Sequence, residues 1–201
     1  CDYIDNTPGV RVKSNGRVIN RDLYFHEGMT WSTIASGPFG MRYVPSGFIF
    51  ETKGSMCFTS KELLPYLLGL YNTPVIQSFL QIVSPTLDYH EGPLGKTPVV
   101  IKPNEKIEEL PEGNEPTQRI EECVDIARKD WDSFETSWDF QHHPLLRKVP
   151  TIAEAFDQWQ TECDNRFNQL KVNEEELNHI FIDIYGLQDE LTPEVEDKNV
   201  T

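Results

Sequence analysis

The final third of the chain carries an apolar side chain at every seventh position, and this repeat constrains the fold more than any other feature. Its members are Phe156, Cys163, Leu170, Leu177 and Ile184, with Ile152, Trp159 and Ile180 at the complementary positions. A repeat sustained over this length predicts one long α-helix that buries a narrow stripe. Pro150-Thr151-Ile-Ala-Glu154 supplies a capping box at the start, and Gly186 supplies a stop. At 1.5 Å per residue the helix would be about 50 Å long.

Two polar residues, Arg166 and Asn173, interrupt the repeat. Asn173 together with Glu176 could therefore cap a second helix after a break. In either case we expect a structural spacer and not a free dimerising zipper, because Trp159 and Phe167 need a wider partner surface than a two-stranded seam offers.

Residues 28–50 show the residue pattern of β-strands and not of a helix. Met41–Val44 and Gly47–Phe50 alternate at strand period on the far side of a Gly37-Pro38-Phe39-Gly40 turn. The aromatic residues of this stretch are expected in the core; they are Trp31, Phe39, Tyr43, Phe48 and Phe50.

Two short helices are expected between Thr59 and Val83. The first begins at a Thr59-Ser-Lys-Glu62 capping box or at Pro65, and the second begins at Thr73-Pro74. A strand at Val99–Ile101 would then return to the sheet. The fold class expected is α+β: a small mixed β-sheet with packed short helices, followed by a helical spacer with a long heptad-patterned helix.

The charge of the chain divides it into two halves. The net charge is −15, yet residues 1–100 carry 8 Lys or Arg and 8 Asp or Glu, whereas residues 101–201 carry 10 and 25. An acidic, proline-containing stretch lies at the transition. These features predict four segments: a recognition domain at 1–102, a linker at 103–116, a helical arm at 117–188 and an acidic tail at 189–201.

A hairpin is predicted at Val10–Asn20, where Asn15-Gly16 suits a type I′ turn. Its cations, Arg11, Lys13 and Arg17, allow two interpretations. The ribbon is either a solvated edge whose charges prevent aggregation, or a basic ribbon lying along a phosphate backbone.

A family resemblance rests on the order of these motifs. Thr30-Trp31-Ser32, the Gly37–Gly40 turn, the helix pair at 59–83 and the closing segment at 85–100 resemble the target-recognition domain of adenine-specific DNA methyltransferases, foremost the bacteriophage-exclusion (BREX) type that is represented by PglX. The chain is more loosely similar to type II restriction-methylation enzymes and type I specificity subunits. Lys129–Phe140 and Asn173–Leu187 extend the likeness into the arm.

The resemblance implies a function in recognising double-stranded DNA for a site-specific methylating enzyme of phage defence or restriction-modification. The candidate DNA-binding residues are Arg11, Lys13, Arg17, Ser36, Arg42, Lys53 and Lys96. Arg42 is the candidate for a base contact, since its guanidinium can bind guanine in a bidentate manner; Lys13 and Lys96 are candidates for phosphate contacts. Ser36 and Gly37 permit a close backbone approach.

The enzymes of this family bind S-adenosylmethionine through a glycine-bearing motif and hold adenine with an Asn/Asp-Pro-Pro-Tyr/Phe motif. This chain has no G-x-G and no Pro-Pro dipeptide. We therefore expect no catalysis and no cofactor in this fragment, and assign S-adenosylmethionine to the parent enzyme. Four scattered cysteines and the irregular acidic and histidine positions at 130–143 predict no metal site.

Asp130-Trp131-Asp132 to Trp138-Asp139-Phe140 combines aromatic and acidic residues, and we expect a packed corner in which two tryptophans anchor one helix on the next. Expected partners are DNA, the missing catalytic domain and other defence proteins. No run of residues is apolar enough for a membrane, and a cytoplasmic location is expected. The alternative function is an acidic helical protein–protein interaction module that does not bind DNA.

Overall fold

A computed structural model describes residues 20–51, 53–86, 88–100 and 115–200. The predicted hairpin, except Asn20, and most of the predicted linker lie outside the described residues. After a 3-10 turn, η1 (Arg21–Leu23), the chain forms β1 (Gly28–Trp31), β2 (Met41–Val44) and β3 (Met56–Cys57) in the order β2-β1-β3.

Both strand pairs are antiparallel, so the described sheet is not mixed. The segment between β1 and β2 is too short for the crossover that a parallel pair requires. The α+β class is confirmed. Residues Gly47–Phe50, in contrast, form no strand, because the turn at Gly47, with φ +108°, bends the chain out of the sheet. Phe48 is 57% exposed, so its predicted place in the core is wrong.

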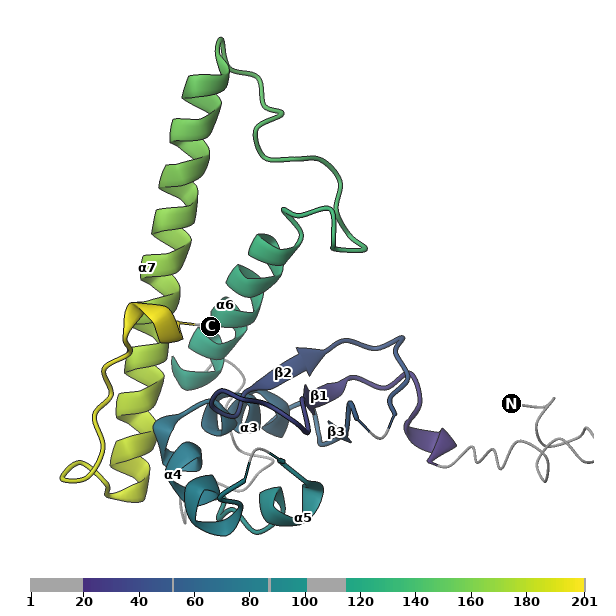
Figure 1. Ribbon diagram of the computed structural model, residues 1–201, viewed down its shortest axis with the longest axis vertical. Coiled ribbons are helices and arrows are strands. Elements are labelled where there is room, and N and C mark those ends of the chain that lie inside the picture. Colours follow the sequence, from purple (N-terminus) through teal and green to yellow (C-terminus); the bar gives the residue numbers. More distant parts are fainter. Residues whose placement is uncertain (1–19, 52, 87, 101–114, 201) are drawn as a thin grey trace, which may run out of the picture.

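Three helices pack beside the sheet: α3 (Leu63–Tyr71), α4 (Pro74–Val83) and the single turn α5 (Glu91–Leu94) (Figure 1). The helix start at Thr73-Pro74 is confirmed. The predicted capping box at Thr59 is wrong, because α3 begins at Leu63 with Glu62 at its N-cap and without a side-chain cap.

The predicted closing strand is also absent from the part of this segment that the structure describes. Residues 98–100 have no regular secondary structure and do not pair with the sheet, and Val99 and Val100 are partly exposed. Their backbone binds the arm instead: the Tyr185 hydroxyl donates to the Pro98 carbonyl at 2.6 Å and accepts from Val100 N–H at 3.1 Å. A hydroxyl from α7 therefore takes the place that a neighbouring strand was expected to fill.

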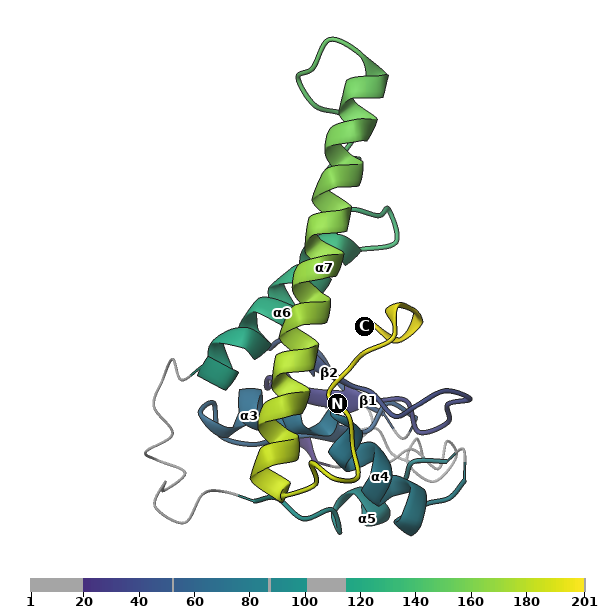
Figure 2. The same cartoon turned by 90° about the vertical axis from the view of Figure 1, so that its left-hand side faces the viewer.

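The arm consists of α6 (Glu115–Trp131) and α7 (Ile152–Tyr185), which rises well beyond the sheet (Figures 1 and 2). The single long helix is confirmed, and α7 continues through Asn173 without a break. Its predicted ends are confirmed as well. The Thr151 side chain accepts from Glu154 N–H, and Gly186 ends the helix with φ +67°.

After α7 the acidic tail turns back along the helix and ends in η3 (Asp197–Asn199). Asn178 donates to the Pro193 carbonyl at 3.1 Å, and Lys171 pairs with Asp197 at 2.6 Å.

One hydrophobic core joins the sheet unit to the lower half of the arm. Met29 and Trp31 of β1, Leu67 and Leu70 of α3 and Phe181 of α7 belong to the same buried cluster. The sheet unit and the arm therefore share packing, and the predicted division of the chain into separate segments stays a prediction. The predicted aromatic corner is wrong: Trp131 is 57% and Trp138 101% exposed, so neither tryptophan anchors one helix on the next.

Within the described ranges, none of the helices combines the length and apolar character that crossing a bilayer requires.

Candidate nucleic-acid interface

The sheet has one face toward the helices and one face away from them. Side chains alternate along a strand, so Met29 and Trp31 of β1 enter the core while Thr30 lies on the opposite face. The register pairs Thr30 with Arg42, which places Arg42 on that opposite face. The sequence pattern thus positions Arg42 through the burial of its neighbour Met41.

Arg42 is exposed, and its Nη1 donates to Ser32 Oγ at 3.3 Å. No carboxylate forms an ion pair with it within the described part of the chain. The guanidinium therefore keeps most of its five donors for an external acceptor, and a planar fork suits a base edge or a phosphate.

Lys53 lies beside the same end of β1. It occupies the turn closed by the Glu51–Gly54 bridge, and its carbonyl accepts from Thr33 Oγ1 at 3.5 Å. Since the Arg42 side chain donates to Ser32 and the Lys53 backbone accepts from Thr33, both residues lie beside the Ser32–Thr33 segment. Each side chain is exposed.

The other predicted residues are less closely connected. Ser36 is exposed in the loop between β1 and β2. Lys96 is exposed beyond the C-terminal end of α5, and no described contact links it to Arg42 or Lys53. Arg11, Lys13 and Arg17 lie outside the described residues. Whether all of the predicted cations share one face stays a prediction.

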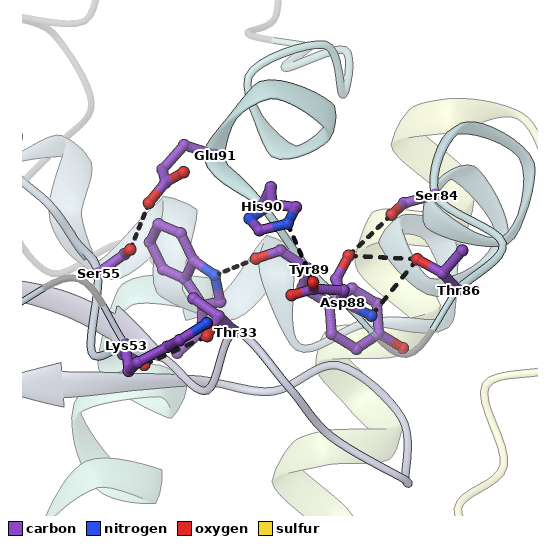
Figure 3. A network of polar contacts seen from close by, with 10 residues as sticks. Thr33, Lys53, Ser55, Ser84, Thr86, Asp88, Tyr89, His90 and Glu91 are labelled. Atoms are coloured by element: carbon purple, nitrogen blue, oxygen red, sulfur yellow. Dashed lines mark hydrogen bonds and ion pairs between the residues drawn. The ribbon is translucent and has the colours of Figure 1, made fainter.

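A strap formed by residues 84–86 and 88–91 fixes the end of β1 in place (Figure 3). Trp31 Nε1 donates to the Tyr89 carbonyl at 2.8 Å, and Tyr89 N–H donates to the Thr33 carbonyl at 2.6 Å. On the other side of the strap, the Ser84 hydroxyl donates to the Asp88 carbonyl at 3.1 Å. Sequence reasoning missed this strap, although a buried Trp N–H generally requires an acceptor.

The strap also carries the titratable groups of this region. His90 Nε2 lies 3.0 Å from Asp88 Oδ2, with the two side chains 59% and 42% exposed. A hydrogen bond from Ser55 lowers the pKa of Glu91. No group of three or more potential metal ligands occurs among the described residues. The arrangement offers hydrogen-bond donors and cations on a rigid frame.

A second feature missed from the sequence is an apolar tip beside the sheet. Phe25, Phe48 and Ile49 are 61%, 57% and 64% exposed. Two backbone hydrogen bonds connect Phe25 to the Gly47–Phe48 segment. Phe25 N–H donates to the Phe48 carbonyl at 2.9 Å, and Gly47 N–H donates to the Phe25 carbonyl at 3.0 Å. Phe25 adopts a φ of +67°, which is rare for a bulky residue, and such strain often marks a functional position.

Two known proteins resemble the chain over nearly all of its length. It is 42% identical over 205 residues to the adenine-specific methyltransferase PglX of Lacticaseibacillus casei (strain Zhang), covering 98% of this chain and 16% of that protein. It is 31% identical over 197 residues to the adenine-specific methyltransferase BrxX of Escherichia coli O9:H4 (strain HS), covering 95% of this chain and 15% of that protein. The chain thus spans about one sixth of the length of these relatives. No family model matches it.

Proposed function

We propose that this chain, which is related to BREX-type adenine-specific methyltransferases, is the part that recognises the DNA target of such an enzyme in phage defence. Binding of S-adenosylmethionine and methyl transfer are assigned to the rest of the longer polypeptide, because neither motif of that chemistry occurs in these 201 residues. The chain then contributes specificity to a reaction that it does not perform.

The exposed guanidinium of Arg42 is the observation that carries this proposal. An arginine held on a strand, hydrogen-bonded only through one nitrogen to Ser32 Oγ, retains the geometry needed for bidentate contact with guanine O6 and N7. Lys53, at the same end of β1, supplies a point charge suited to phosphate. The balanced charge of residues 1–100 also avoids the repulsion that the acidic half would exert on DNA.

The first experiment replaces Arg42 by Ala in the full-length methyltransferase. Loss of a bidentate base contact should weaken specific binding by about 1–3 kcal/mol and relax the recognised site at one position. Arg42→Lys keeps the charge but loses the fork, so it should relax the site as well. Methylome sequencing of cells that carry each variant measures both effects.

Lys61→Ala is the matched control, since Lys61 is a highly exposed cation that precedes α3 and pairs with Glu27 at 3.7 Å. It should leave the methylated site unchanged. Lys13→Ala, by contrast, should weaken binding to all sequences alike and reduce the salt slope by about one unit. An Arg42→Ala enzyme that methylates the original site with unchanged selectivity would contradict the proposal.

The second candidate function is an interaction module that binds protein and not DNA. It is favoured by one observation, the large exposed aromatic side chains near the end of α6. Salt separates the two candidates: DNA affinity falls steeply as salt rises because neutralised phosphates release counterions, whereas an apolar protein interface is far less sensitive. Binding of labelled DNA and of partner proteins across a salt series distinguishes them.

A further inference from the structure

The last two residues of α6 and the turns that follow it form a knuckle, here defined as residues 130–140. A series of turns shapes it: Phe134 N–H donates to the Trp131 carbonyl at 3.2 Å, and Ser137 N–H donates to the Phe134 carbonyl at 3.0 Å. Ser137 is buried, donates to Asp132 Oδ1 at 2.6 Å and accepts from Asp139 N–H at 3.1 Å. These bonds within the knuckle hold its backbone in one shape.

The knuckle directs its largest side chains into solvent. Trp131, Phe134 and Trp138 are 57%, 45% and 101% exposed. Aromatic residues presented in this way are the groups that most often dominate protein interfaces, because each buries a large area at a small cost in conformational entropy. A backbone that is already ordered lowers that cost further.

The same residues are uniformly acidic. Residues 130–140 contain four carboxylates and no lysine or arginine. Asp130 pairs with Arg166 at 3.4 Å, while no ion pair is found for Asp132, Glu135 or Asp139 in the described part of the chain. The knuckle is therefore an aromatic surface that also carries three carboxylates without an ion pair in the described part of the chain.

We propose that the knuckle docks onto a basic protein surface with an apolar centre, located elsewhere in the same longer polypeptide. Lysine or arginine side chains there would meet the carboxylates and stack on the face of Trp138. DNA does not fit, because its phosphates are repelled. A second copy of the knuckle does not fit either, because it would place acidic residues against acidic residues.

The two relatives favour a partner surface that lies within the same polypeptide. Their length exceeds this chain about sixfold, so most of each enzyme lies outside the aligned segment. A surface in the same polypeptide is present at high effective concentration. This inference rests on the proposed function only in treating the chain as part of a longer methyltransferase. It adds that the arm couples target recognition to the remaining domains through a defined contact.

The test is zero-length carbodiimide cross-linking of the full-length enzyme, which joins a carboxylate to a lysine in direct contact. Peptides containing Glu135 or Asp139 should be joined to lysines outside the aligned segment. Trp138→Ala should reduce the yield about tenfold or more, because it removes the central aromatic contact. Trp138 is fully exposed, so its replacement does not disturb the core.

Ile82→Ala is the matched control: Ile82 is 77% exposed on α4, away from the knuckle, and its replacement should leave the cross-links unchanged. The inference is overturned if no such cross-links form in the isolated enzyme, if Trp138→Ala leaves them intact, if they join two copies, or if they require a separate protein. Arg42→Ala distinguishes it from the proposed function, since that variant should alter the methylated site and retain the cross-links.

Discussion

At the scale of single residues, Asn173 shows how a polar group can be accommodated in the middle of a long helix. It is fully buried, with 0% of its surface exposed. Its Nδ2 donates to Glu122 Oε2 at 2.8 Å, and its Oδ1 accepts from Gln169 Nε2 at 3.1 Å and Arg119 Nη1 at 3.4 Å. A buried amide satisfied by partners on both helices favours one register of α7 against α6.

Cys123 lies beside this network and gives a prediction at the same scale. Burial raises the pKa of its thiol to about 12, and the nearby charge of Glu174 acts in the same direction. Since the thiolate is the nucleophile, Cys123 should react very slowly with iodoacetamide at about pH 8 in the folded protein and readily in denaturant. Mass spectrometry of the peptides measures this. Equal rates in both conditions would contradict the burial of the thiol.

At the scale of elements, the crossing of α3 with the arm depends on a missing side chain. A Cβ added at Gly69 would lie 2.5 Å from Ile120 Cδ1 of α6 and 3.3 Å from Phe181 Cε2 of α7. Both neighbours are buried, so neither can move into solvent. Glycine therefore permits the close approach of three helices, although it is a poor helix former.

Gly69→Ala should consequently destabilise the protein. Alanine gains about 0.5–1 kcal/mol in helix propensity, but overpacking costs about 1–3 kcal/mol, and we expect a lower free energy of unfolding. Gly92→Ala is the control, because a Cβ there meets nothing within 4 Å. Urea unfolding of both variants measures the change in the free energy of unfolding. A Gly69→Ala protein that is more stable than the parent would show that α3 does not pack closely against the arm at Gly69.

The loop before α7 is attached by an ion pair that depends on pH. Arg147 Nη1 and Nη2 donate to Glu162 Oε1 and Oε2 at 2.7 and 3.0 Å. These hydrogen bonds lower the pKa of Glu162 from its usual 4.5. A carboxylate with a lowered pKa adds stability above its unfolded pKa and loses it as pH falls through the folded value.

The Glu162→Gln variant should therefore unfold at a slightly lower temperature than the parent at neutral pH. The difference should be small because Glu162 is about half exposed, and it should vanish in acid. Thermal unfolding at neutral pH and below about pH 4 measures it. A difference that persists in acid would show that the substitution acts through something other than charge.

At the scale of the whole molecule, the sheet unit and the arm are distinct in charge and continuous in packing. Ile120 of α6 and Leu177 and Phe181 of α7 belong to the same core cluster as Met29 of β1. Beyond this shared base, α7 extends well past the sheet toward its N-terminal end (Figure 2). The acidic half is therefore anchored to the frame that carries the cations beside β1.

This organisation predicts the behaviour of a nicked chain. The proline-containing acidic stretch should be cleaved first by a protease, between Glu105 and Glu115. The two pieces should nevertheless stay together in size-exclusion chromatography, because the core that joins them lies on both sides of the cut. First cleavage within residues 30–58, or separation of the pieces after cleavage, would show that the shared packing is not what holds the chain together.

The sequence by itself determined the elements whose signals are local. The heptad stripe predicted the helical character of α7, Thr151 and Gly186 predicted its two ends, and Thr73-Pro74 predicted the start of α4, because capping and periodicity depend on neighbours along the chain. The continuity of α7 through Asn173 was left open by the sequence. The alternation around Met41 placed Arg42 on a strand, and the register then brought it opposite Thr30. The motifs in the sequence resembled adenine-specific methyltransferases, and both relatives found by comparison belong to that class.

Only the tertiary structure decided which apolar side chains are buried. Phe48, Trp131 and Trp138 are large apolar residues of the kind that usually lies in a core, yet more than half of the surface of each is exposed. Val100 was expected in a strand, but its N–H found an acceptor in Tyr185, more than eighty residues away in the chain. Burial and hydrogen-bond partners of this kind depend on contacts between distant segments, and local patterns carry no information about where those segments meet.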